Sequence, residues 1–192
     1  MKSFPFTMMF ALLLGLGSFA FAGGNAPEKV SKKEVPREIG GLKPADYTDA
    51  PLRVVIEREL AASPAELWRY LGNSKTLPLW LKQVKRVDLE KAVHAVNEQG
   101  ATRVCRFGNT PLSEKIVYIA EERLFAYQAA DNAMLSNHLG VIKIEPHGEG
   151  SRLTWYQFFD KGSSGMKSSM IKLMMPGMIK KCIKRLDKLA RS

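Results

Sequence analysis

Residues 56–71 read IERELAASPAELWRYL, and they join a predicted strand to a predicted helix. In the first part, Ile56 and Leu60 point to one face, and the acidic residues between them point to the other. This two-residue period is typical of a half-buried strand, and the β-branched residues just before it extend the same pattern. We therefore expect a strand over residues 52–60 with one apolar face.

A capping box marks the start of the helix. Ser63 stands at the N-cap, Pro64 at the first helical position, and Glu66 three residues after the cap. These residues predict a helix over residues 64–71. Residues 76–81, TLPLWL, are too short and too interrupted by proline for more than a brief second helix.

Beyond these helices the sequence pattern predicts consecutive strands joined by turns. Gly108-Asn109, Asp131-Asn132 and residues 146–150 supply turn residues between the alternating apolar stretches. A run of hairpins of this kind predicts one antiparallel meander. The six strands expected in it cover residues 84–89, 101–107, 112–119, 124–130, 138–145 and 152–159.

The chain closes with a helical segment, residues 166–190, which has a proline and a glycine in its middle. At about 100° per residue, the apolar face before Pro176 is rotated by roughly a third of a turn from the apolar face after it. Both faces reach the core only if the helix bends at the proline. We therefore expect a long, bent C-terminal helix whose two halves both face inward.

This order of elements resembles the START-like (SRPBCC) superfamily, which includes polyketide cyclases, plant Bet v 1-type allergens and lipid-transfer domains. Residues 56–71 look like the family's opening strand and capped helix, residues 77–80 like its short second helix, and residues 140–155 like its last hairpin. The resemblance covers residues 52–190 and implies an α+β helix-grip fold. In that fold a curved antiparallel sheet of about seven strands surrounds a long C-terminal helix, with two short helices after the first strand.

The resemblance also implies an apolar ligand cavity, because the gripped helix does not fill the whole concave face of the sheet. The expected lining comes from inward strand residues, the segment around Trp80 and the methionine-rich first half of the last helix. Flexible thioether side chains suit an adaptable pocket, although a methionine stripe at helical spacing is also ordinary core. The expected ligand-binding residues are Arg58, Trp80, Arg106, Glu114, Tyr118, Tyr127, His138, Met166, Met170 and Met174.

The function implied by this fold is binding or carriage of a lipid or other apolar small molecule. The alternative is an enzyme of the cyclase or dehydratase type, with Glu114 or His138 as acid or base beside Tyr118 or Tyr127. The same side chains can instead point outward or close structural hydrogen bonds, so the enzyme is the less favoured reading. The sequence has no motif of a hydrolase, a metal site, a redox thiol pair or a nucleotide-binding loop, and we expect neither a cofactor nor a metal.

The N-terminus has the features of an export signal. Lys2 precedes an apolar run, and the tripeptide AFA ending at Ala22 fits a signal-peptidase site. The run is shorter than the roughly 20 apolar residues of a membrane anchor. We expect cleavage near Ala22, a flexible arm over residues 23–51, one START-like domain over residues 52–192, and a periplasmic or secreted location.

The chain carries a formal net charge of +10 at pH 7. Export removes nucleic acid from the expected partners, whereas an anionic membrane surface remains one. After Gly177 the basic residues fall on the helix face opposite the apolar one, so this face either docks on anionic lipid or is simply solvated. They are Lys180, Lys181, Lys184, Arg185, Lys188 and Arg191.

Two cysteines, Cys105 and Cys182, would enter an oxidising compartment with the exported chain. Their spacing fits neither a metal site nor a redox motif. The family fold implies that the strand of Cys105 runs beneath the last helix, where a disulfide to Cys182 would staple helix to sheet. Two separate buried thiols are the alternative.

Overall fold

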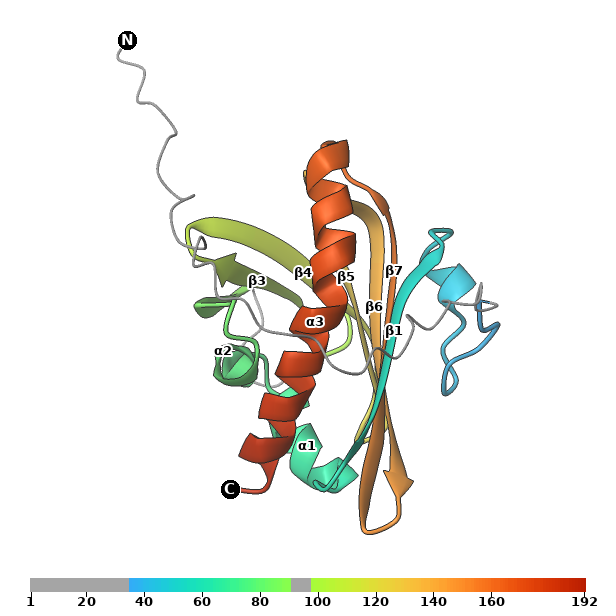
Figure 1. Cartoon of the computed structure of the whole chain (residues 1–192), viewed down its shortest axis with the longest axis vertical. Coiled ribbons are helices and arrows are strands. Elements are labelled where there is room, and N and C mark those ends of the chain that lie inside the picture. The colour runs from blue at the N-terminus through green and yellow to red at the C-terminus, as the bar shows by residue number, and fades with distance from the viewer. Residues whose placement is uncertain (1–34, 91–97) are drawn as a thin grey trace, which may run out of the picture. The chain divides into compact units, whose positions relative to one another are not determined.

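The computed structural model describes residues 35–90 and 98–192. Seven strands form one antiparallel sheet in the order β1-β7-β6-β5-β4-β3-β2 (Figure 1). Strands β2 to β7 are therefore neighbours in chain order, and β1 pairs with β7 at the edge of the sheet. The predicted meander is confirmed. The strands are β1 (Leu52–Leu60), β2 (Arg86–Glu90), β3 (Thr102–Phe107), β4 (Thr110–Ala120), β5 (Leu124–Ala129), β6 (Leu135–His147) and β7 (Gly150–Lys161).

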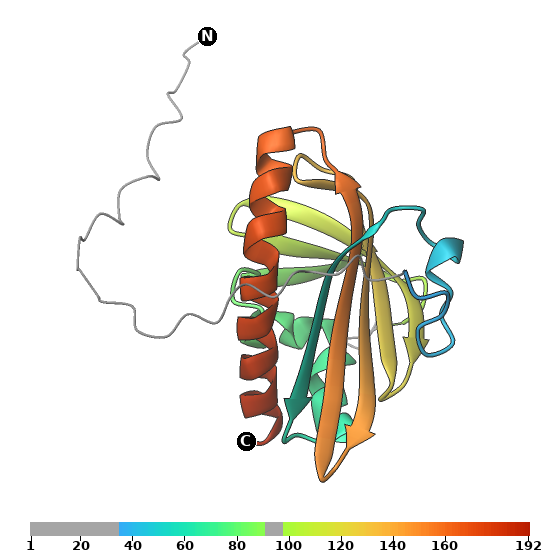
Figure 2. The same cartoon turned by 45° about the vertical axis from the view of Figure 1, so that its right-hand side comes forward.

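The helices complete the expected helix-grip architecture. They are α1 (Pro64–Leu71), α2 (Leu77–Trp80) and α3 (Gly165–Ala190), with short 3-10 turns η1 (Pro44–Asp46) and η2 (Ser74–Thr76). The capping box is present, because the Glu66 carboxylate accepts a hydrogen bond of 2.7 Å from the Ser63 N–H, and the Ser63 hydroxyl accepts from the Glu66 N–H. The bond from the Ser63 backbone lowers the pKa of Glu66. Figures 1 and 2 show α3 lying along the concave side of the sheet.

The main core lies between the concave face of the sheet and α3. Alternate strand residues such as Ile142 and Trp155 point toward the helix, and Ile183 and Leu186 of α3 meet them. Burying a side chain of this size stabilises the fold by about 1.5–3 kcal/mol. This packing fixes the second half of α3 on the sheet.

A second, smaller core covers the convex face of the sheet. Ile39 and Leu42 pack there with strand residues that include Leu124 and Phe158, all of them buried. A flexible arm was expected over residues 23–51. In its described part, residues 35–51, this segment is instead ordered and packs on the sheet. The convex face exposes apolar side chains of its own, so a segment with few apolar residues becomes ordered by covering them.

Polar contacts fix this covering segment at its other end. The Thr48 hydroxyl donates to the Asn137 carbonyl at 2.7 Å, and the Gln128 side-chain amide donates to the Tyr47 carbonyl at 2.6 Å. Both partners lie on the sheet or at its rim, so the segment is tied to β5 and β6. The predicted signal peptide and the first part of the expected arm, residues 1–34, lie outside the described residues.

The C-terminal helix differs from expectation in its first half. α3 is one continuous helix (Figure 2). Pro176 lies inside it, and before that proline only Ser168 and Met175 are buried. The first half therefore turns its apolar face to solvent, and no bend is needed to bring two faces to one core. The exposed apolar residues of this half are Met166, Met170, Leu173 and Met174.

Two irregularities interrupt the strand period. β4 shifts register between Ile116 and Tyr118, and β6 shifts register between Ser136 and Leu139. A bulge places an extra residue on one strand and so reverses the faces of the residues beyond it. Both shifts decide which polar side chains enter the interior.

Candidate functional site

Two tryptophans lie in the interior between the sheet and the helices. Trp80 comes from α2 and Trp155 from β7, and their rings meet edge to face with centroids 6.1 Å apart. Both residues are buried, with about 4% and 5% of their surface exposed. Neither indole N–H makes a hydrogen bond of normal geometry with the described residues, although the Trp155 N–H lies near the Tyr127 hydroxyl. An unpaired buried donor is uncommon in proteins and is energetically costly.

A buried ion pair lies on the same concave face, at the β3–β4 hairpin. Arg103 and Glu114 are direct cross-strand partners, and Glu114 Oε2 accepts from Arg103 Nε and Nη2, each at 2.8 Å. Burial acts against the charge of Arg103, but the neighbouring Glu114 carboxylate more than offsets this and the pKa of the guanidinium is raised. The pair therefore keeps a charge of each sign inside the protein.

Aromatic rings and a thiol surround this pair. The Arg103 guanidinium lies 5.3 Å from the ring centre of Phe125 and 5.6 Å from that of Tyr127, which are cation–π distances. The Cys105 thiol donates to Glu114 Oε2 at 3.3 Å. Burial, followed by the nearby carboxylate, raises the pKa of both Cys105 and Tyr127, so both stay protonated.

A chain of hydrogen bonds continues from Tyr127 across the sheet. The Gln157 amide donates to the Tyr127 hydroxyl at 3.0 Å, and Gln157 Oε1 lies 2.7 Å from His138 Nε2. His138 Nδ1 accepts from the Ala129 N–H at 3.1 Å. These partners require a neutral imidazole with its proton on Nε2, and burial lowers the pKa of His138 in agreement.

The polar groups of the interior are thus engaged with one another. His138 uses its lone pair on a backbone N–H and its proton on Gln157, while Glu114 accepts from Arg103 and Cys105. In this state neither residue is a free general base. The described residues contain no group of three side chains suited to hold a metal ion. These paired polar groups can fix the shape of the space between the sheet and α3. The two indole N–H groups there can donate hydrogen bonds to a ligand.

A family described as "polyketide cyclase / dehydrase and lipid transport" matches residues 51–191. The chain belongs to this family. The membership confirms the resemblance seen in the sequence and the ligand-binding fold that goes with it.

Solved structures share the same fold. The protein XoxI from Bacillus cereus is 17% identical with a TM-score of 0.59, and the match covers 72% of this chain and 95% of that one. A protein from Thermobifida fusca is 22% identical with a TM-score of 0.57, covering 71% and 93%. The di-domain ARO/CYC StfQ from the steffimycin biosynthetic pathway is 13% identical with a TM-score of 0.59, covering 72% and 50%. Comparison with curated protein sequences gives no match.

The family fold brings four of the predicted site residues into the interior. Trp80, Glu114, Tyr127 and His138 are buried, and the last three belong to the polar groups described above. Strand alternation alone accounts for Glu114 and Tyr127. His138 enters the interior because the register shift in β6 places it beside the end of β5. There its Nδ1 accepts a hydrogen bond from the Ala129 N–H in place of a backbone carbonyl.

Two predicted strand residues lie outside the interior instead. Tyr118 packs with the second core on the convex face, because the β4 bulge reverses its side relative to Ile116. Arg106 alternates with the inward Cys105 and pairs with Asp88 at 2.9 Å on the outer face. Neither residue is placed to contact a ligand beneath α3.

The remaining predicted residues are exposed. Met166, Met170 and Met174 lie on the solvent side of α3, with exposed fractions of 77%, 51% and 61%. Arg58 is exposed on the edge strand β1, beside α3. These positions belong to the surface around the interior rather than to its lining.

Three interior residues escaped the sequence analysis: Arg103, Trp155 and Gln157. A signal for Arg103 was available, because a two-residue Gly108-Asn109 turn pairs Phe107 with Thr110 and therefore residue 103 with residue 114. An acid and a base at facing inward positions predict an ion pair. Trp155 and Gln157 alternate along β7 with outward residues. Because this strand carries apolar residues on both faces, its sequence does not show which face points to the interior.

The two cysteines are buried, free thiols in the structure. Cys105 is engaged by the Glu114 carboxylate rather than by Cys182. Burial raises the pKa of Cys182 to about 11. Of the two alternatives, the structure has the separate buried thiols, and the Cys105 thiol is directed to Glu114 on the neighbouring strand β4.

A hollow of about 320 Å³ lies where β5 and β6 separate, with Ser113, Gln128 and His138 among its walls. Another, of about 410 Å³, lies between β1 and the second half of α3. No helix in residues 35–90 and 98–192 combines the length and the apolar content needed to cross a membrane.

Proposed function

We propose that this protein is an exported binder or carrier of a lipid or other apolar small molecule, held between the sheet and α3. The signal-like sequence ending at Ala22 supports export, and an exported chain would act in the periplasm or outside the cell. Family membership supports ligand binding in this fold. The observation that carries the proposal is the buried Trp80–Trp155 pair, whose two indole donors make no hydrogen bond of normal geometry within the described part of the protein.

The indole pair suits a ligand that is mostly apolar and has an oxygen acceptor. The two rings offer apolar surface, and a carbonyl or ether oxygen would accept from the two indole N–H donors. The surrounding polar groups are already paired, so they give the interior its shape without needing the ligand. Because both tryptophans are nearly fully buried, a ligand reaches them only when the helices over them move.

The first half of α3 is the part best suited to move. Most of its apolar side chains face solvent, and few of its residues before Pro176 are buried. Few buried contacts mean a low free energy of local opening. The exposed residues Met166, Met170, Leu173 and Met174 would line the way in for an apolar molecule.

Native mass spectrometry of protein purified from its own periplasm tests the proposal directly, since a co-purifying ligand identifies its class. Long-chain fatty acids and aromatic probes are then titrated into delipidated protein. We expect Trp80→Phe and Trp155→Phe, which keep an aromatic ring but remove the N–H, to weaken binding about tenfold, as the loss of one or two hydrogen bonds predicts. Trp68→Phe is the matched control, because Trp68 lies on α1 and only at the edge of the core. An interior that is always empty and binds no such probe contradicts the carrier.

Membrane docking through α3 is the loading step of the same proposal. The exposed apolar first half stands next to the basic second half, a combination that inserts into a bilayer surface and meets anionic headgroups at about 1 kcal/mol per Lys or Arg. Co-sedimentation with anionic and zwitterionic vesicles at low and high salt measures it. A Leu173→Gln/Met174→Gln variant should lose apolar anchoring, and a Lys180, Lys181, Lys184 and Lys188 to Gln variant should lose the preference for anionic vesicles. Equal binding to both vesicle types would contradict docking.

The second candidate is an enzyme of the cyclase or dehydratase type. It is favoured by the convergence of Glu114, Tyr127 and His138 on the concave face, although each is already hydrogen bonded. Mass spectrometry of a reactive poly-β-ketone incubated with the protein measures ring closure or loss of water. Tyr127→Phe and His138→Asn should abolish product while ligand binding persists. A product that forms equally with the variants excludes these residues as the catalytic groups.

A further inference from the structure

The hollow between β1 and α3 is formed by an edge strand and the basic half of a helix. Residues 58–60 of β1 form one wall, and five residues of α3 between positions 180 and 187 form the other, around about 410 Å³. Among the strands of residues 35–90 and 98–192, β1 is the last on this side of the sheet and leaves an uncovered edge. A volume of this size falls in the range of small-molecule sites, about 300–1,000 Å³.

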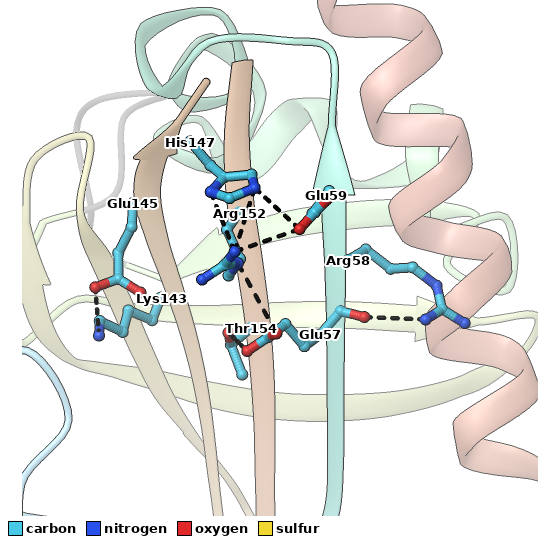
Figure 3. A network of polar contacts seen from close by, with 8 residues as sticks. All are labelled: Glu57, Arg58, Glu59, Lys143, Glu145, His147, Arg152 and Thr154. Atoms are coloured by element: carbon cyan, nitrogen blue, oxygen red, sulfur yellow. Dashed lines mark hydrogen bonds and ion pairs between the residues drawn. The ribbon is translucent and has the colours of Figure 1, made fainter. Parts of the chain in front are cut away.

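Four cations border the hollow: Arg58, Lys180, Lys181 and Lys184. Within residues 35–90 and 98–192, none of them has an acidic partner within ion-pair distance. The Arg58 guanidinium donates a hydrogen bond from Nη1 to the Glu57 carbonyl at 3.0 Å. Figure 3 shows its side chain directed away from the polar network of the outer face and toward α3.

The two acids at the hollow are committed to other partners. Glu59 accepts from His147 at 2.9 Å and from Arg152 at 3.3 Å, on the outer face of the sheet (Figure 3). Asp187 accepts from the Ala62 N–H at 3.0 Å and from Arg191 at 3.2 Å. The positive charge that faces the hollow therefore remains uncompensated.

The chemistry of the hollow is that of an anion site with an apolar side. Leu60 and buried Ile183 contribute apolar surface beside the cations. We propose that this groove binds a phosphate monoester with a small organic group, either free in solution or as the headgroup of a lipid. A phosphate monoester carries up to two negative charges and three acceptor oxygens, which suits one guanidinium fork and three ammonium groups better than a single carboxylate does.

The site stands apart from the proposed interior. The Trp80–Trp155 pair lies in the main core, whereas the groove opens to solvent outside the β1–α3 contact. Phosphate binding therefore depends on neither a carried ligand nor its entry. Arg58 lies on β1 and not on α3. A contribution of Arg58 to binding therefore distinguishes this site from binding by the basic face of the helix alone.

Isothermal titration of the purified protein with inorganic phosphate and with glycerol 3-phosphate tests the site, at low salt and at physiological salt. We expect saturable binding with one site, stronger for glycerol 3-phosphate, and tighter above the second phosphate pKa of about 6. Arg58→Gln and Lys184→Gln should each weaken binding at least tenfold. Lys188→Gln is the matched control, with the same charge loss on the same helix outside the groove, and should change affinity less than twofold. Unchanged thermal midpoints confirm that each variant folds.

Vesicles that contain phosphatidic acid, compared with vesicles of equal charge made with phosphatidylglycerol, identify the source of the phosphate. Preference for phosphatidic acid that disappears in Arg58→Gln assigns the groove to a lipid headgroup. Binding of glycerol 3-phosphate without that preference assigns it to a free phosphate ester. Absence of saturable binding to any of these probes, or equal weakening by Lys188→Gln and Arg58→Gln, overturns the proposal and leaves a basic edge that only guards against sheet-edge association.

Discussion

Arg103 and Glu114 form an ion pair almost out of contact with water, with about 5% and 9% of their side chains exposed. Removing one partner would leave the other charge buried and unpaired, which costs far more than the pair itself contributes. Arg103→Met should therefore lower the free energy of unfolding by about 3–5 kcal/mol in urea denaturation. The double variant Arg103→Met/Glu114→Leu should recover most of that loss.

The exposed ion pair on the outer face of the neighbouring strands is the control for this prediction. Asp88 pairs there with Arg86 and Arg106, whose side chains are 69% and 36% exposed. Asp88→Asn should change stability far less, because water screens both charges. Equal losses for Asp88→Asn and Arg103→Met would mean that the interior pair is not dry.

His138 makes the stability of the fold depend on pH. Burial lowers its folded pKa below the ordinary value of 6.5, so between those two values the unfolded chain binds a proton that the folded chain does not. The free energy of unfolding should therefore be highest above pH 6.5 and fall as the pH drops toward the folded pKa. Urea denaturation from pH 5 to pH 8 measures the slope.

The variant His138→Asn isolates this contribution from the other titrating groups. Its amide oxygen can accept from the Ala129 N–H, but it has no proton to gain, so the slope below pH 6.5 should become shallower. His147→Gln is the control, because His147 lies on the outer face with 41% of its side chain exposed. A slope unchanged in His138→Asn would assign the pH dependence elsewhere.

Among the elements, β5 and β6 approach each other closely at one glycine. A methyl group on Gly140 would meet the ring of Tyr127, whose position is fixed by Gln157. Gly140→Ala should therefore cost about 1–3 kcal/mol, the usual range for overpacking a core. Gly165→Ala, at the first residue of α3 with nothing within 4 Å, should be neutral or slightly stabilising. Thermal unfolding compares the two, and equal midpoints would contradict the close contact.

α3 also shows that one helix can serve two environments. Its second half packs on the sheet, while its first half keeps methionine and leucine side chains in solvent. An exposed apolar face of this kind usually marks an interaction site. In the proposed function it is the route by which an apolar ligand enters.

For the whole molecule, the two thiols report on unfolding. Burial raises the pKa of Cys105 and Cys182, so both should react slowly with iodoacetamide in the folded protein and rapidly in denaturant. Mass spectrometry should find two alkylated cysteines after unfolding without reductant. If alkylation in denaturant requires prior reduction, the two cysteines are bridged and the free-thiol arrangement is wrong.

The family fold was predictable from local signals along the chain. The capping box at Ser63, the hairpin turns and the long last helix each depend on neighbouring residues, and together they allow one common architecture. Strand alternation likewise predicted the inward positions of Glu114 and Tyr127. The same rule misplaced Tyr118, since a bulge is a single extra residue that hydrophobic periodicity does not mark.

What the sequence by itself determined, then, is the order of elements, the family and the inward side of regular strands, because these follow from short-range periodicity. Only the tertiary structure decided that residues near Ile39 cover the convex face and that the first half of α3 faces solvent. It also decided that Arg58 stands with Lys184 across a groove. Each of these depends on which surface remains uncovered once distant segments pack, and burial of that surface is a property of the assembled chain rather than of any stretch within it.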